Sequence, residues 1–408
     1  MRHQTCALVL LALLVDCRIA FSQSSQPPVQ LARPYATPSV ANPPRVIGWP
    51  AGMKPKAPPG FQVNVYADNL NQPRWLYVLP NGDVLVCESF AGRVTLLRDT
   101  TGNGTANFRS PFLTNLRRPF GIEKDGSTIY IACTDAVHTF TYNDGDTKIT
   151  SAGKKIMDLP AFGYNNHWTR NLLIDRGAGK LYITVGSGTN VDEEKADIKD
   201  WRRAAILVSN LDGSGLRLFA SGLRNPIGLA LCPASHKLWT VVNERDGLGD
   251  DLVPDYLTSV KDGGFYGWPY AYFGQHEDPS HKGERPDLVA KTIVPDCALG
   301  NHVAALGLCF YNDKSFPTHY QNGVFVGEHG SWNSSKRVGY KVAYVPFNNG
   351  AAAGAPEDFL TGFAKGEKEL DVYGRPVGVV VAKDGSLLVA DDGAGIIWRV
   401  SHPSKNNQ

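Results

Sequence analysis

Short apolar strands separated by turns recur along most of this chain. From Phe61 onward, hydrophobic and polar positions alternate with the period of two that strands require, and the period of a helix is nearly absent. One pattern repeats: a polar residue, often beside a proline, then a short apolar strand, a glycine turn and a second alternating strand. Its copies begin at Pro73, Pro119, Arg170, Asn225, Ala305 and Pro376.

The spacing and closure of this repeat predict a β-propeller. Successive copies start about 60 residues apart, longer than the roughly 40–50 residues of a four-stranded blade, so we expect the excess to form loops on one face. A lone strand at 61–66 and a last strand at 396–400 can complete one blade between them and leave no free edge. A pair of β-sandwiches is the alternative, but it does not explain one pattern recurring six times. We therefore predict an all-β, six-bladed β-propeller over residues 60–408.

The beginning of the chain has the features of a secretory signal. Arg2 precedes an apolar run at 7–15 that is too short to span a bilayer, and Ala20-Phe-Ser offers a small-residue cleavage site. Residues 1–22 are predicted to be a signal peptide, and residues 23–59 a Pro/Ser-rich extension that partly wraps the domain. This predicts a secreted, extracellular protein with no membrane partner. Sequons at Asn103 and Asn333 are compatible with a glycoprotein.

Five cysteines remain after the predicted signal peptide, at positions 87, 133, 232, 297 and 309. Cys297 and Cys309 are close enough in sequence to clamp a loop, and we predict a disulfide between them. An odd number leaves at least one buried thiol. No spacing of cysteine and histidine suggests zinc or an iron–sulfur cluster.

Composition narrows the class of protein further. The chain has 41 Lys and Arg against 39 Asp and Glu, a formal net charge of +2, which excludes the footprint of a nucleic-acid-binding protein. A hydrophobic fraction of 42% is enough to build a large core and excludes disorder over the whole length. The 42 glycines and 27 prolines suit a turn-rich β protein.

The polar residue that begins each repeat is most often a cation or an imidazole. If the apolar strands line the central channel, these residues face one mouth of it, and Arg binds carboxylates bidentately. They predict a compact ligand with several carboxylates. The alternative is that these arginines satisfy carbonyls at blade ends or pair with neighbouring aspartates. The residues are Arg74, Arg118, His167, Arg170, Arg224, Asn225, His302 and Arg375.

Four motifs carry a family resemblance over residues 61–400. They are Asn166-His-Trp-Thr-Arg, Leu223-Arg-Asn-Pro-Ile-Gly, Gly264-Phe-Tyr-Gly-Trp-Pro and Ser335-Lys-Arg-Val. With them the chain resembles the quinoprotein sugar dehydrogenases, and most closely the fungal pyranose dehydrogenases of auxiliary activity family twelve. The resemblance implies pyrroloquinoline quinone (PQQ), a tricarboxylate, held over the channel with a calcium ion (Ca2+).

The resemblance also implies roles for individual residues. Arg224, Asn225, Lys336, Arg337 and Arg375 would bind the quinone, and Arg74, Arg118, Arg170 and His302 join them by blade position only. His167 falls at the position of the family's catalytic base. There it would take the proton of the sugar's C1 hydroxyl while hydride passes to the quinone, a task suited to a base titrating near neutrality.

The loop 244–251 is the predicted calcium site. It offers acidic side chains and the tight glycine turns whose carbonyls calcium also uses. By the family pattern, carbonyls near Asp246 and Gly247 would hold the cofactor calcium, with Asp250 and Asp251 on a second, structural ion. The bacterial glucose dehydrogenases have Gly-Pro where this chain has Asp246-Gly247. The alternative is that the acids of this loop are solvated turn residues that bind no metal.

Aromatic residues in or beside these loops offer planes for the apolar faces of sugar rings. They are Trp168, Tyr266, Trp268, Tyr270, Tyr272 and Trp332, of which Trp268 and Tyr270 are expected to be core anchors.

The resulting prediction is a secreted, PQQ- and calcium-dependent sugar dehydrogenase that oxidises a pyranose at C1 to the lactone. Electrons would pass to an external acceptor, either a cytochrome domain protein or a copper polysaccharide monooxygenase. One alternative is a calcium-dependent lactonase or esterase on the same fold, which would polarise a carbonyl with a metal held by side-chain carboxylates. Another is a non-enzymatic extracellular binding propeller, since fold alone does not decide function.

Overall fold

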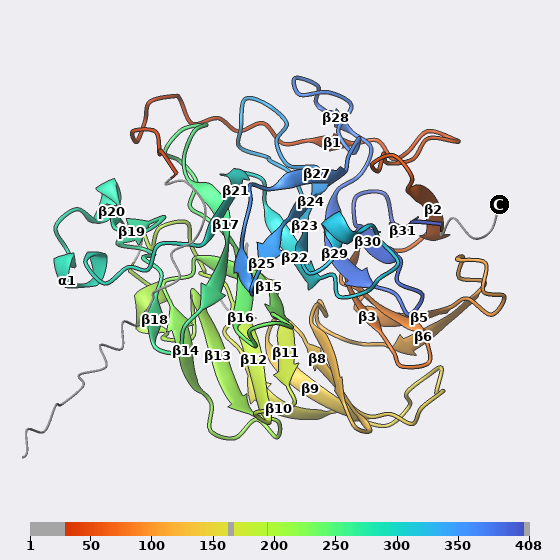
Figure 1. Ribbon diagram of the computed structural model, residues 1–408. Helices are drawn as coiled ribbons and strands as arrows, with labels where there is room; N and C mark the ends of the chain where they lie inside the picture. The colour runs from red at the N-terminus through yellow and green to blue at the C-terminus, as the bar shows by residue number, and fades with distance from the viewer. Residues whose placement is uncertain (1–28, 162–166, 194, 404–408) are drawn as a thin grey trace, which may run out of the picture.

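Six blades, each with four antiparallel strands, stand around a central axis in the computed structural model, which describes residues 29–161, 167–193 and 195–403 (Figure 1). Blade 1 consists of β3 (Pro73–Val78), β4 (Val84–Glu88), β5 (Arg93–Arg98) and β6 (Phe108–Leu113). Blade 2 consists of β7 (Ile122–Asp125), β8 (Thr128–Ala132), β9 (Ala136–Thr141) and β10 (Lys154–Asp158). Blade 3 consists of β11 (Leu172–Asp175), β12 (Lys180–Val185), β13 (Ala205–Asn210) and β14 (Arg217–Ser221). The predicted six-bladed propeller is confirmed.

Blades 4 to 6 follow the same order along the chain. Blade 4 consists of β15 (Asn225–Leu231), β16 (Leu238–Asn243), β17 (Pro254–Val260) and β21 (Cys297–Asn301). Blade 5 consists of β22 (Ala305–Phe310), β23 (Val324–Glu328), β24 (Lys341–Val345) and β27 (Glu357–Leu360). Blade 6 consists of β29 (Pro376–Val381), β30 (Leu387–Asp391), β31 (Ile396–Ser401) and β2 (Gln62–Ala67). The early strand β2 pairs antiparallel with the last strand β31, with Gln62 opposite Ser401, so the ring closes as expected.

The glycine in the first strand of several repeats has a packing role. A Cβ at Gly307 in blade 5 would lie 2.0 Å from the carbonyl oxygen of Val377 in blade 6. A Cβ at Gly378 in blade 6 would lie 2.5 Å from the carbonyl oxygen of Arg74 in blade 1. Inner strands of neighbouring blades therefore approach too closely for a side chain, which explains why the repeat keeps a glycine there.

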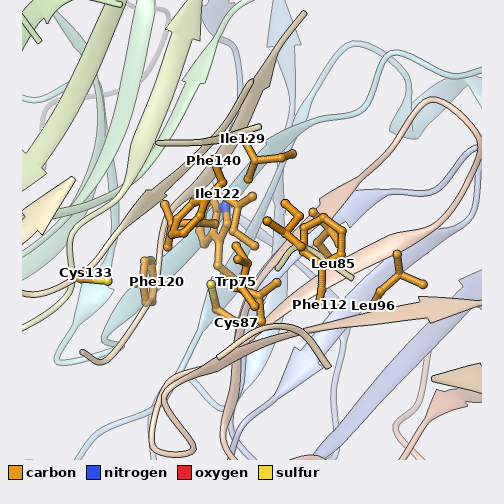
Figure 2. Close-up of a cluster of buried hydrophobic side chains, with 14 of the residues drawn as sticks. Trp75, Leu85, Cys87, Leu96, Phe112, Phe120, Ile122, Ile129, Cys133 and Phe140 are labelled. Carbon is orange, nitrogen blue, oxygen red and sulfur yellow. The ribbon is translucent and has the colours of Figure 1, made fainter. Parts of the chain in front are cut away.

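Apolar side chains fill the spaces between adjacent blades. Figure 2 shows the cluster between blades 1 and 2, where Trp75 and Phe120 pack with ring centroids 5.3 Å apart. Both Cys87 and Cys133 are buried in this cluster as thiols, and burial raises the pKa of the Cys133 thiol to about 12. These thiols act as small apolar side chains.

The predicted disulfide between Cys297 and Cys309 is wrong. Cys297 in β21 belongs to the apolar cluster between blades 4 and 5, whereas Cys309 in β22 packs against the cluster between blades 5 and 6. The sheet of blade 5 separates these clusters, so nearness in sequence does not bring the sulfur atoms together. Burial raises the pKa of the Cys309 thiol to about 12.

Residues 29–59, here called the strap, run along the edge of the propeller, with its one short strand β1 (Arg45–Val46) pairing parallel to β28 (Asp371–Val372) (Figure 1). Asn42 donates its backbone N–H to the Trp332 carbonyl, and Trp49 donates its indole N–H to Asp391 at 2.8 Å. The strap thereby contacts loops of blades 5 and 6. The predicted signal peptide, residues 1–22, lies outside the described residues, and no helix among those described has the length and apolar character to cross a membrane.

An insertion at 261–296 connects β17 to β21 and folds back onto blade 3. It contains β18 (Gly264–Phe265), β19 (Ala271–Tyr272), β20 (His276–Glu277) and the short helix α1 (Pro286–Val289). Strand β18 pairs parallel to β14, with Ala220 opposite Gly264. A second small hairpin pairs β25 (Phe347–Asn348) with β26 (Ala351–Ala352).

Buried acids make the stability of this fold depend on pH. Burial raises the pKa of Glu328, whose two carboxylate oxygens have no hydrogen-bond partner in the described part of the chain, to about 8, and that of Glu123 to about 8. The folded state thus holds protons that the unfolded chain has already released, and its stability falls as pH rises from about 4.5 to 8. The half-buried His167, whose pKa desolvation lowers, acts in the opposite direction, but only below about pH 6.5.

We therefore expect the free energy of unfolding to decrease between pH 6.5 and 8, by up to about 1.4 kcal/mol per pH unit for each such group, and the midpoint of thermal unfolding to decrease with it. Scanning calorimetry at constant ionic strength measures it. Glu328→Gln should flatten the profile, whereas Glu369→Gln, at an exposed position, should not. Equal profiles for wild type and Glu328→Gln would contradict the assignment.

Candidate active site

A cavity of about 470 Å³ opens where the first strand of each blade begins and the second strand ends. Both kinds of strand end meet on one face because neighbouring strands within a blade are antiparallel. Many of the predicted site residues line it: Arg74, His167, Arg224, Asn225, Asp246, His302 and Arg375. Several other lining residues were not predicted as ligand-binding residues from the sequence, among them Thr189, Asn190, Asp255 and His329.

His167 is held in one tautomer by the loop after β12. Its Nδ1 lies 3.0 Å from the Ser187 carbonyl oxygen and 2.9 Å from the Ser187 hydroxyl, which itself donates to the Thr189 carbonyl. A carbonyl accepts only, so Nδ1 carries the proton and Nε2 keeps its lone pair. Burial, and then the nearby Arg224 guanidinium, hold the pKa of His167 well below its usual value. This side chain is a neutral base at pH 7.

The second histidine of the cavity has both ring nitrogens in use. His302 donates from Nε2 to the Gly249 carbonyl at 2.9 Å, and its Nδ1 accepts from the Asn333 amide at 3.1 Å. That amide also donates to Asp246 at 2.6 Å. Asn333 is therefore a buried linking residue, and a glycan on its sequon would have no room, whereas Asn103 is exposed.

The third histidine belongs to a charged cluster that joins blades 1, 5 and 6. His329 Nε2 lies 2.7 Å from Asp392, whose other oxygen accepts from Arg74 at 2.5 Å. Arg375 donates from Nε and Nη2 to the carbonyls of His329 and Gly330. Burial, and then the Arg375 charge, lower the pKa of His329 to about 4, so it too is neutral at pH 7.

Arg224 organises the opposite wall of the cavity. Its guanidinium donates to the backbone and side-chain oxygens of Asn190, to the Glu244 carbonyl and to the Asp246 carboxylate. Every nitrogen of this arginine already has an acceptor. Arg224 therefore fixes the loops after β12 and β16 relative to each other. It behaves as the alternative interpretation of these arginines expects, since it satisfies carbonyls and pairs with a neighbouring aspartate.

One acid and one amide in the wall of the cavity are incompletely paired. Within the described residues, neither Asn225 Oδ1 nor Glu244 Oε1 has a hydrogen-bond partner, although both are buried. Burial raises the pKa of Glu244 to about 7 and that of Asp255 to about 6. Buried polar atoms without partners at the wall of a cavity are suited to a polar ligand.

Two predicted cation positions lie outside this cavity. Arg170 is completely buried and donates to the carbonyls of Pro160, His167 and Thr169, which makes it a support for the loop that carries His167. Arg118 is exposed, with its guanidinium 5.8 Å from the Phe90 ring centre and 5.7 Å from that of Trp168. Neither arginine is among the residues that line the cavity, although Arg118 lies against Trp168, which is.

The remaining predicted residues line a separate hollow beside the strap. Lys336, Arg337, Asp250 and Asp251 lie there, and Arg337 donates to the backbone and side-chain oxygens of Asn42. The Asp250 carboxylate accepts from the Ser335 backbone N–H at 3.0 Å. These side chains join the strap to the loops of blades 4 and 5.

The predicted calcium ligands are occupied by protein donors. The Asp246 carbonyl accepts from Asn190 Nδ2 at 2.9 Å and from Arg245 Nε and Nη2 at 3.0 and 2.8 Å. Among the residues that the structure describes, no three His, Cys, Asp or Glu side chains are grouped as a metal site. Gly247 has φ +93°, which explains the glycine in this turn but places no side chain at the site.

The aromatic residues divide between cavity and core. Trp168 and Trp332 line the cavity, and Trp332 is exposed at its mouth. Trp268 is buried and donates its indole N–H to the Asn190 carbonyl, as expected of an anchor. The other three, all in the insertion, are Tyr266 and Tyr272, which are buried, and Tyr270, which packs against His281.

Comparisons with known proteins agree with this architecture. A family model described as TrAA12-like matches residues 55–255 and 279–403. An uncharacterized protein of Borreliella burgdorferi is 30% identical over 362 residues, covering 85% of this chain and 90% of its own length. The pyrroloquinoline quinone-dependent pyranose dehydrogenase of Coprinopsis cinerea is 25% identical over 409 residues, covering 84% of this chain, which spans only 54% of that protein.

Solved structures show the same fold. The PQQ domain of the Coprinopsis cinerea pyranose dehydrogenase in its holo form has a TM-score of 0.73 at 22% identity, covering 87% of this chain and 98% of that one. A calcium structure of the Trichoderma reesei enzyme of carbohydrate-active family AA12 has a TM-score of 0.74 at 20% identity, covering 88% and 98%.

Proposed function

The chain belongs to the TrAA12-like family, and on that premise we propose that it is a PQQ-dependent sugar dehydrogenase that oxidises a pyranose at C1. One observation in the structure carries the proposal. His167 presents an unprotonated Nε2 to a cavity that three arginine side chains also reach.

The cavity has the chemistry to hold the quinone. Its volume of about 470 Å³ lies within the roughly 300–1,000 Å³ of small-molecule sites. Within the described residues, Arg375 has acceptors for Nε and Nη2 only, which leaves Nη1 for a ligand. The Nε of Arg74 is buried and has no hydrogen-bond partner there. Arg74 and Arg375 would therefore hold carboxylates of the quinone, with Asn225 beside them. Arg224 would contribute its charge, since its donors are already in use.

When bound, the quinone supplies the acceptor for the hydride that leaves C1 of the sugar. The protein contributes the proton transfer: His167 Nε2 takes the proton of the C1 hydroxyl, and Ser187 keeps the ring in that orientation through Nδ1. Trp168 and Trp332 offer aromatic faces to the sugar ring at the cavity mouth. The oxidised product is the lactone.

Calcium dependence is part of the proposal, supported by the calcium structure of the similar Trichoderma reesei enzyme. The donor set at Asp246 does not fit a calcium ion without rearrangement, because its carbonyl already accepts three N–H bonds. We assign no step to calcium. Secretion, and electron transfer to a cytochrome or a copper polysaccharide monooxygenase, complete the proposal and rest on the sequence.

A titration tests this function. Metal-stripped protein should bind PQQ in calorimetry, with affinity that increases when calcium is added, and should then reduce a dye only when a sugar is present. Arg74→Met with Arg375→Met should weaken quinone binding at least tenfold, since each variant removes a charged donor to carboxylate. Absence of binding at micromolar quinone would contradict the proposal and direct attention to lactone hydrolysis.

A further inference from the structure

A shallow hollow of about 400 Å³ lies beside the cavity just described. Asp392 forms part of its wall, and the same carboxylate pairs with Arg74 and His329 in the cavity. The rest of the wall comes from the segment 69–72, the turn 393–395 and Phe90. We call it the Phe90 hollow. Asp392 therefore lies between this hollow and the arginine and histidine of the cavity wall with which it pairs.

Phe90 is an unusual side chain for this position. It is 64% exposed, in the turn between β4 and β5, and so follows a second strand, as the cavity residue His329 does. Arg118 lies against both Phe90 and Trp168, and Arg74 lies against the Trp168 ring at 5.2 Å. Alternating rings and guanidinium groups thus lead from the cavity to the Phe90 hollow.

The backbone of Arg118, the cation between the Phe90 and Trp168 rings, is strained. Arg118 has φ +48°, a left-handed conformation that is uncommon for residues other than glycine. Such conformations cost free energy and persist where the surroundings require them. The Arg118 guanidinium lies 5.8 Å from the centre of the Phe90 ring, and Phe90 is still 64% exposed.

Polar groups in the same hollow are suited to hydroxyls. Gln72 lines the hollow, and its Oε1 is buried with no hydrogen-bond partner among the residues that the structure describes. Asn71, which is exposed, also lines the hollow, and the Arg118 guanidinium lies 5.8 Å from the centre of the Phe90 ring. An aromatic face next to amide oxygens and N–H donors is the combination that recognises a sugar ring, with its apolar C–H face and its equatorial hydroxyls.

We propose that the Phe90 hollow binds the second ring of a disaccharide or longer oligosaccharide whose reducing-end ring occupies the cavity. This inference rests on the proposed function for the identity of the ring in the cavity. It makes oligosaccharides better ligands than the corresponding monosaccharides. The Phe90 ring supplies the stacking face, and Gln72 Oε1 accepts a hydrogen bond from a sugar hydroxyl.

Calorimetry on the full chain tests the inference without relying on turnover. The ligands are glucose and mannose, and their β-1,4-linked disaccharides cellobiose and mannobiose, with any bound quinone reduced beforehand. Either disaccharide should bind roughly threefold to tenfold tighter than its monosaccharide, and Phe90→Ala should remove that difference while leaving monosaccharide affinity unchanged.

Phe108→Ala is the matched control. Phe108 is 38% exposed with Arg98 over its ring at 5.6 Å, but it lies in the outer strand β6, away from the cavity. This variant should keep the preference for disaccharides. Gln72→Leu should reduce it, and circular dichroism of each variant checks that the fold is retained.

The outcomes separate the two proposals. Equal affinity for mono- and disaccharides, or a preference that survives Phe90→Ala, would overturn the second-ring site. A preference that depends on Phe90 in a protein that never reduces a dye would support the second-ring site and count against the dehydrogenase.

Discussion

Replacing His167 by alanine is expected to lower kcat by about 10²–10⁴-fold with sugar as the donor, while quinone affinity remains within a few-fold of wild type. The reason is that Nε2 is an unprotonated base facing the cavity, whereas Ser187 and not a ligand holds Nδ1. Steady-state dye reduction gives kcat, and calorimetry gives quinone affinity. A loss of turnover with retained binding places His167 in proton transfer.

His329 is the comparison that makes this result specific. Its Nε2 is held by Asp392, and its place in the charged cluster links it to Arg375. His329→Ala is therefore expected to weaken quinone binding more than it lowers kcat. If His329→Ala abolished turnover and His167→Ala did not, the base would be His329. His319→Ala, at an exposed position, is the control variant and should change neither kcat nor quinone affinity.

The pH profile gives a second measure of the same assignment. Burial and Arg224 lower the pKa of His167, so the base is free well below pH 6.5. Wild-type kcat/KM should therefore hold its value from pH 7 down past pH 6.5 before the acid limb begins.

Replacing Asp278 by alanine is expected to cost about 3–5 kcal/mol of the free energy of unfolding. Asp278 accepts two hydrogen bonds from Arg245 at 2.9 and 3.0 Å, and both side chains are buried. Removing the carboxylate leaves the guanidinium charged, buried and unpaired. Because Arg245 also donates to the Asp246 carbonyl, quinone affinity should fall as well. Urea unfolding followed by fluorescence measures the first effect.

Asp262 offers a matched control for this ion pair. It forms a bidentate pair with Arg217 at 2.6 Å, but both side chains are about half exposed, so Asp262→Ala should cost less than about 1 kcal/mol. A double variant, Arg245→Met with Asp278→Leu, should recover much of the stability, since it leaves no unpaired charge. If Asp278→Ala and Asp262→Ala were equally mild, the insertion 261–296 would not depend on this contact.

The sequence was sufficient for the fold because the fold is a local repeat. Alternating strands, glycine turns and the closing strands at each end depend on residues close in the chain, and each glycine such as Gly307 marks a close approach of neighbouring blades. The same repeat located six of the cavity side chains, including His167 and Arg375, since the position before each inner strand faces one mouth.

Only the tertiary structure decided which cations are available to a ligand. Arg170 and Arg224 occupy the predicted blade position, yet Arg170 does not line the cavity and every nitrogen of Arg224 already has a protein acceptor. No local pattern distinguishes them from Arg375. The residues that follow the second strands, such as His329 and Asp392, were missed because the repeat varies there. The disulfide predicted between Cys297 and Cys309 was wrong because local spacing does not show which blades meet. Contacts between blades join residues far apart in sequence, and burial, which sets pKa and pairing, exists only once the blades have closed.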